Sequence, residues 1–196
     1  MAGISQMNVT CGHCGNSSQV DVYPSVNVGE EPELKARVIS GELFVHECPH
    51  CGSRELLRYD MLYHDPEERL LLCLSDKGIR IDDMRDYTGR IVPDAGTLIE
   101  KIKIFDAGLD DVVMELCKLI TVQELGRDVD LKFFGMDGAD NDLTLAYPEN
   151  GRMEMLKIGF NVYEDCAGIV NRNPGMREGS RGLARIDRDW LSGYVG

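Results

Sequence analysis

Cys11-Gly12-His13-Cys14-Gly15 and Cys48-Pro49-His50-Cys51-Gly52 repeat one short pattern, a Cys-x-x-Cys pair followed by glycine, with 33 residues between Cys14 and Cys48. We call them the first and the second knuckle. One tight turn lets both cysteines of a pair bind the same ion. The glycine after the second cysteine relieves the backbone strain of that turn. Two pairs supply the four thiolates of a closed tetrahedral site. The sequence therefore predicts one structural zinc ion, with iron as an alternative metal, bound by Cys11, Cys14, Cys48 and Cys51.

The same tetrapeptides, Cys-Gly-His-Cys and Cys-Pro-His-Cys, also serve as redox sites in thiol oxidoreductases. In those proteins the first cysteine stands at the N-terminus of a helix, which lowers its pKa. Here Asn16-Ser17-Ser18 follows the first knuckle and Ser53-Arg54 follows the second, and both lead into strand-like sequence. The pattern favours structural zinc and leaves a thiol oxidoreductase as a less favoured alternative.

Composition limits the classes of partner. The chain of 196 residues has 21 Lys and Arg against 34 Asp and Glu, a formal net charge of −13, and no basic cluster. Such a balance disfavours nucleic acid and anionic membrane surfaces, because phosphate contacts draw on Lys and Arg. The start of the chain, Met1 to Gln6, lacks the basic and apolar parts of a signal peptide, and no run of 18 apolar residues occurs. We therefore expect a cytoplasmic protein without membrane contact.

Strand patterns flank both knuckles. Residues 4–10 and 20–28 surround the first, while residues 42–47 and 55–60 surround the second. Between them, Pro32 and neighbouring acids predict the start of a helix that ends at Gly41. Strand, knuckle and strand occurring twice is typical of a zinc ribbon, here with a helical insertion. We predict a turn at residues 62–65, a buried strand at 69–74, and a domain boundary thereafter.

The remaining sequence predicts a second, α+β domain. Residues 97–105 and about 110–125 carry apolar stripes at helical spacing and form an αα-hairpin. Residues 130–136, 143–147 and 153–163 predict a small antiparallel sheet, and a helix follows at about 163–171. Residues 172–182 predict a loop, and Asp187 is placed to cap a last helix. The predicted organisation is residues 1–75 as the zinc-ribbon domain, 76–94 as a connection, and 95–196 as the α+β domain.

Beyond the cysteines themselves, several stretches resemble the CpXC domain family of bacteria and archaea. The resemblance covers roughly residues 5–120 and departs at Gly12, where the family pattern has proline. It supports the metal site and the fold but implies no activity, because the family has none assigned. The matching stretches are residues 9–15, 21–28, 41–44, 48–52, 62–65, 90–92, 98–105 and 108–111.

Other polar residues offer weaker sites. His13 and His50 lie inside the knuckles, but four thiolates already complete a zinc shell, so we expect both histidines to be exposed. His64 beside Asp65 lacks a nucleophile with a recognisable motif, which favours a structural hydrogen bond over a general base. Residues 137–142 lack the ligand spacing of a calcium loop and predict a hairpin turn. We expect the three remaining cysteines, Cys73, Cys117 and Cys166, to be small buried apolar residues.

A closed four-thiolate site has no open position at which to activate water. Together with the acidic balance and the lack of a catalytic motif, this favours a non-enzymatic, zinc-stabilised interaction module with a protein partner. An alternative from a different functional class is a regulator that binds nucleic acid through the zinc ribbon.

Overall fold

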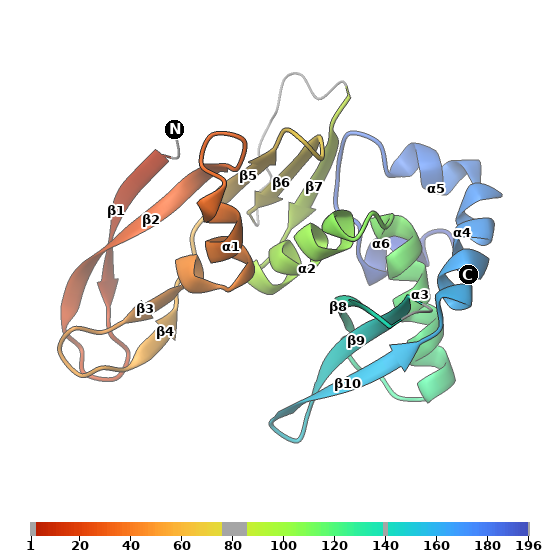
Figure 1. The fold of residues 1–196 in the computed structure, drawn as a ribbon. Coiled ribbons are helices and arrows are strands. Elements are labelled where there is room, and N and C mark those ends of the chain that lie inside the picture. The colour runs from red at the N-terminus through yellow and green to blue at the C-terminus, as the bar shows by residue number, and fades with distance from the viewer. Residues whose placement is uncertain (1–2, 76–85, 139–140, 196) are drawn as a thin grey trace. The chain divides into compact units, whose positions relative to one another are not determined.

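The computed structural model of the protein describes residues 3–75, 86–138 and 141–195, which form a mixed α+β structure (Figure 1). The chain divides into two compact units, residues 1–99 and 100–196, and the division falls within helix α2 (Ala95–Asp106). The α+β class agrees with the sequence prediction. Of the predicted connection, residues 76–85 lie outside the described residues, and residues 88–92 form a strand.

The first unit is built on a mixed β-sheet. In this unit β1 pairs antiparallel with β2, β2 parallel with β5, β5 antiparallel with β6, and β6 parallel with β7. A separate short hairpin joins β3 to β4. The strands are β1 (Gly3–Thr10), β2 (Ser17–Asn27), β3 (Val45–Glu47), β4 (Arg54–Leu56), β5 (Met61–Asp65), β6 (Leu70–Leu74) and β7 (Thr88–Val92).

Helix α1 (Glu33–Ile39) is the predicted insertion between the two knuckles. It buries Leu34 and Val38, and the chain leaves it through Gly41 in the left-handed conformation, with φ of 77°. The strand predicted over residues 42–47 is only partly correct. Glu42–Phe44 forms a single 3₁₀ turn, η1, which buries the consecutive residues Leu43 and Phe44, and the strand begins after it. A strand with one solvated face would bury only alternate residues.

The turn predicted at residues 62–65 is wrong, because these residues belong to strand β5. Burial alternates along β5, and its last residue, Asp65, is buried although it is charged. Lys35 on α1 pairs with the Asp65 carboxylate at 3.0 Å, and the Tyr63 hydroxyl lies 3.3 Å from the same oxygen. A distant lysine thus stabilises a polar residue that, by local sequence, is typical of a turn.

The second unit combines helices with a small antiparallel sheet, as predicted. Its strands lie in the order β10-β9-β8, and their inner faces bury Phe133, Leu143 and Leu145. The strands of this sheet are β8 (Lys132–Asp137), β9 (Asp142–Glu149) and β10 (Arg152–Ile158), and a further short strand, β11 (Leu183–Ala184), is not part of it. The helices after α2 are α3 (Asp111–Leu125), α4 (Phe160–Asn171), α5 (Pro174–Gly179) and α6 (Arg188–Ser192).

Side-chain caps fix the starts of several helices in the second unit. Asp110 accepts hydrogen bonds from the N–H groups at the start of α3, and Asp187 caps α6 as predicted. The loop predicted at residues 172–182 is wrong over α5. Asn173 caps this helix, Pro174 occupies its first turn, and Met176 is completely buried. Proline is tolerated in a first turn, so a stretch rich in Pro and Gly still forms a short helix.

Candidate metal centre

The two knuckles lie at the tips of the two hairpins β1–β2 and β3–β4, and they have the same backbone geometry. In the first, the Cys11 N–H donates to Asn16 O at 2.9 Å and the Gly15 N–H donates to Cys11 O at 2.9 Å. In the second, the equivalent bonds from Cys48 and Gly52 are each 2.8 Å. Both glycines have a φ of 72°, in the left-handed region where a side chain is strained. The sequence duplication is therefore a structural duplication.

The four cysteine sulfurs converge on one point. All lie within 4.8 Å of one another, and Sγ–Sγ distances of 3.7 Å join Cys11 to Cys51 and Cys14 to Cys48. A tetrahedral ion with Zn–S bonds of about 2.3 Å needs sulfurs about 3.8 Å apart, whereas a disulfide needs about 2.05 Å. The spacing fits a tetrahedral metal and not a pair of disulfides. Each of these two close pairs takes one sulfur from each hairpin.

Polar groups hold the hairpins around the sulfurs. The Ser53 hydroxyl lies 3.1 Å from Cys11 Sγ and 3.2 Å from Cys51 Sγ, which places it between the two knuckles. Glu55 on β4 accepts a hydrogen bond of 2.7 Å from the Gly12 N–H. The Asn16 amide lies 3.5 Å from Cys14 Sγ. Donors around coordinating atoms orient them and stabilise their charge.

These contacts set the acidity of the thiols. The hydrogen bond from Ser53, with backbone N–H groups of the first knuckle, lowers the pKa of Cys11 to about 6, and Ser53 also lowers the pKa of Cys51. At Cys48 the His50 N–H acts in the same direction, but burial and the neighbouring sulfurs prevail and raise the pKa to about 11. Four converging thiols of this kind can bind a metal as thiolates, with release of the protons still bound.

The histidines lie outside this group of sulfurs. His13 and His50 are exposed, as expected. His46 on β3 is half-buried, and its Nε2 lies 3.0 Å from the Ser18 hydroxyl, which ties the two hairpins together. His64 makes a hydrogen bond of 3.1 Å with the Tyr87 hydroxyl, which agrees with a structural role.

Within the described residues, the four cysteines are the one group of three or more His, Cys, Asp or Glu side chains that could hold a metal ion. Asp137 on β8 pairs with Asp142 on β9, and residues 139 and 140 of the predicted hairpin turn lie outside the described residues. Cys73, Cys117 and Cys166 are buried, as predicted.

Sequence reasoning missed Ser53, Glu55 and Asn16. Ser53 and Glu55 act on the opposite knuckle, so their roles depend on how the hairpins meet, whereas Asn16 acts on Cys14 of its own knuckle. One local signal was present: a polar residue directly follows the glycine of each knuckle, Asn16 after Gly15 and Ser53 after Gly52.

Comparison with known proteins gives one match. A family model described as CpXC protein matches residues 9–118, more than half of the chain and a range that includes both knuckles. No curated protein and no solved structure matches the chain. None of the described helices has the length and apolar character required to cross a membrane. The chain belongs to the CpXC protein family.

Proposed function

We propose that this protein is a non-enzymatic interaction module whose two N-terminal hairpins form a zinc ribbon around one structural zinc ion. The observation that carries the proposal is the convergence of four sulfurs from two hairpins at tetrahedral spacing. Four thiolates complete the coordination of zinc, so the ion supports folding and does not activate water.

The need for a metal follows from the size of the hairpins. Strands β3 and β4 have three residues each, too few for a hairpin that is stable by itself in water. Zinc binding supplies on the order of 10 kcal/mol to the folding of small four-ligand domains. In this proposal the ion fixes the position of the second hairpin against the first and so creates a rigid surface.

In this proposal, the surface binds a protein partner in the cytoplasm. Leu56 on β4 leaves 76% of its surface exposed, although it lies three residues from Ser53 and the sulfur cluster. Exposed large apolar side chains at the centre of a polar rim are typical of protein contacts. The net charge of −13 favours a partner with a basic rim and disfavours nucleic acid.

The test is affinity capture with the metal-loaded wild-type chain and three variants. A partner that the wild-type chain recovers reproducibly should be lost with Leu56→Ser, which changes the surface, and with Cys48→Ser, which changes the metal site. Ile4→Ser, an exposed residue of β1, is the matched surface control and should retain the partner. Recovery of no partner, or equal recovery by all variants, contradicts the proposal. Salt-sensitive binding of DNA or RNA at low salt would replace it with the nucleic-acid alternative.

A further inference from the structure

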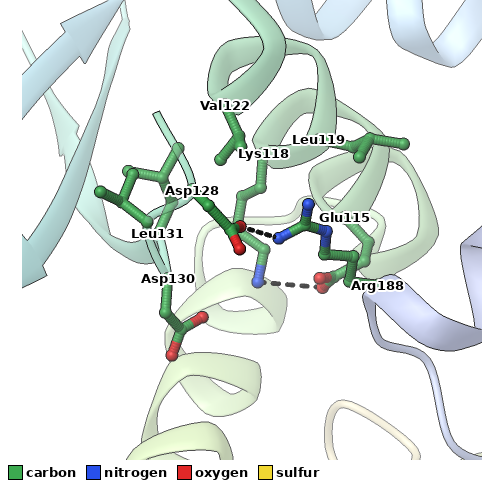
Figure 2. A pocket seen from close by; sticks show the side chains of 9 residues that line it. Glu115, Lys118, Leu119, Val122, Asp128, Asp130, Leu131 and Arg188 are labelled. Carbon is green, nitrogen blue, oxygen red and sulfur yellow. Dashed lines mark hydrogen bonds and ion pairs between the residues drawn. The ribbon is translucent and has the colours of Figure 1, made fainter. Parts of the chain in front are cut away.

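The second unit contains a cavity of about 290 Å³ that the metal centre does not explain. One stripe of α3, with residues at positions i, i+3, i+4 and i+7, forms one wall, and residues 128–131 form another. Figure 2 shows Arg188 of α6 and Asp128 facing each other beside this stripe. The side chains that α3 contributes are Glu115, Lys118, Leu119 and Val122.

Buried charges form the floor of this cavity. The Lys118 Nζ lies 2.9 Å from a carboxylate oxygen of Glu115 and 2.9 Å from one of Glu100. All three side chains are at least nine-tenths buried. The Glu100 carboxylate also accepts a hydrogen bond of 2.8 Å from the Phe133 N–H, and Lys132 lies 3.6 Å from it. Glu100 is thus well compensated by groups outside the cavity.

Glu115 is compensated less well. Lys118 is its ion-pair partner within the described part of the chain, and Glu100 shares that lysine. Burial raises the pKa of Glu115 above its ordinary value in spite of the nearby charges of Lys118 and Lys101. Among the charged side chains that line the cavity, three carboxylates meet two cations, and one negative charge remains. The carboxylates are Glu115, Asp128 and Asp130, and the cations are Lys118 and Arg188.

The other side chains of the cavity are aliphatic, or they form an ion pair at the rim that a ligand can displace. Leu119, Val122 and Leu131 supply aliphatic walls beside the charged floor. At the rim, Arg188 pairs with Asp128, and both side chains are more than half exposed. An exposed ion pair contributes no more than about 1 kcal/mol, so a ligand can displace it at small cost.

We propose that this cavity binds a small organic cation, an ammonium or guanidinium group on a short apolar stem. The cation lies against the Glu115 carboxylate and supplies the missing positive charge, while the stem contacts Leu119 and Val122. The cavity volume of about 290 Å³ leaves room for a short alkylammonium ion. A neutral or anionic ligand of the same shape leaves the excess charge uncompensated and binds more weakly.

The experiment is a titration of the full metal-loaded chain, observed by amide chemical shifts, with butylammonium, butanol and butyrate as probes of one shape. Butylammonium should cause saturable shifts at residues 115–131 and should bind at least tenfold more tightly than butanol or butyrate. Glu115→Gln should weaken butylammonium binding at least fivefold. Glu154→Gln removes the same charge from an exposed position on β10 and should leave it unchanged.

Equal binding of the three probes, shifts elsewhere only, or unchanged binding by Glu115→Gln overturns the proposal. If Glu115→Gln does not fold, Asp130→Asn replaces it. Asp130 has a side chain that is 75% exposed, so its loss leaves the core intact, and it should weaken butylammonium at least twofold. Unchanged binding in that variant also overturns the proposal. The experiment is independent of the proposed zinc ribbon, because all cavity residues lie in the second unit.

Discussion

The hydroxyl oxygen of Ser53 lies 3.1 Å from the sulfur of Cys11, a residue of the other knuckle. The same hydroxyl lies 3.2 Å from Cys51 Sγ, so one side chain joins sulfurs from both hairpins. A thiolate accepts a hydrogen bond more strongly than a thiol does, and the contact therefore favours the charged form that binds metal.

Replacement of Ser53 should weaken the metal site without abolishing it. Ser53→Ala removes the donor but keeps all four sulfurs, and loss of such a supporting group typically lowers metal affinity by about 10- to 100-fold. Competition with a chromophoric zinc chelator measures the change. Ser17→Ala is the matched control, because its hydroxyl bonds to Thr10 and to no sulfur. Equal affinity of both variants would show that Ser53 does not act on the metal.

Metal binding should release protons, and the release should depend on pH. Cys48, with a pKa of about 11, holds its proton at pH 7, whereas Cys11, with a pKa of about 6, has already lost it. A metal must displace the protons that remain, so metal affinity falls as pH falls. Calorimetric titration in buffers of different ionisation enthalpy should give at least one proton released per zinc ion at pH 7. A value of zero would contradict the thiol environment found here.

The clustering of the four cysteines was the most predictable feature because its chemistry is local. Two cysteines at a fixed spacing and one glycine define each knuckle, and the backbone bonds of the two turns are the same. The capping residue Asp187 was predictable for the same reason, since a cap depends on residues within one turn.

The features that sequence analysis missed depend on distant partners. Strand β5 ends on a buried aspartate that pairs with Lys35 on α1, and local sequence indicates a turn there. The parallel pairings of β2 with β5 and of β6 with β7 join segments with no common local pattern. In α5, burial of Met176 outweighs a Pro- and Gly-rich sequence. In each of these segments, contacts with residues distant in the sequence determined the local structure.

Thiol accessibility should separate the seven cysteines into two classes. The four cysteines of the knuckles bind metal in this account, while Cys73, Cys117 and Cys166 are buried elsewhere. Burial raises the pKa of Cys73 to about 11, and the hydrogen bond that the Cys117 thiol donates to Cys166, together with burial, raises the pKa of Cys117, which makes both thiols unreactive. A chromogenic disulfide reagent should detect no fast thiol in the zinc-loaded chain, four after chelation and seven in denaturant. Fast reaction of four thiols in the presence of bound zinc would contradict this assignment.

The buried charges of the second unit should stabilise its fold in a pH-dependent way. Burial opposes the charge on Glu100, but Lys118 and Lys132 outweigh it and lower the pKa of Glu100 below its ordinary value. A lowered carboxyl pKa contributes stability above the unfolded-state pKa of about 4.3, and that stability is lost as pH falls through the folded-state value. Glu100→Gln should lower the free energy of unfolding by about 3 kcal/mol at pH 7, because Lys118 loses one buried partner.

Urea unfolding between pH 7 and pH 3 measures this effect. The difference between wild type and Glu100→Gln should shrink as the pH falls, because protonation of Glu100 removes the same charge. Glu154→Gln, on an exposed strand position, should match the wild type at pH 7 within about 0.5 kcal/mol. A difference that stays constant over the whole pH range would show that the ionised form of Glu100 contributes nothing.

The central claim is that sulfurs from both knuckles hold a single metal ion, and the metal content of two Cys→Ser variants under native mass spectrometry tests it most directly. The wild-type chain should carry one zinc ion, and Cys48→Ser should lose it on mild chelation. Cys73→Ser changes a buried cysteine of the same unit away from the knuckles and should keep its zinc. A metal-free wild-type chain after refolding with zinc, or zinc retained equally by both variants, would contradict the account.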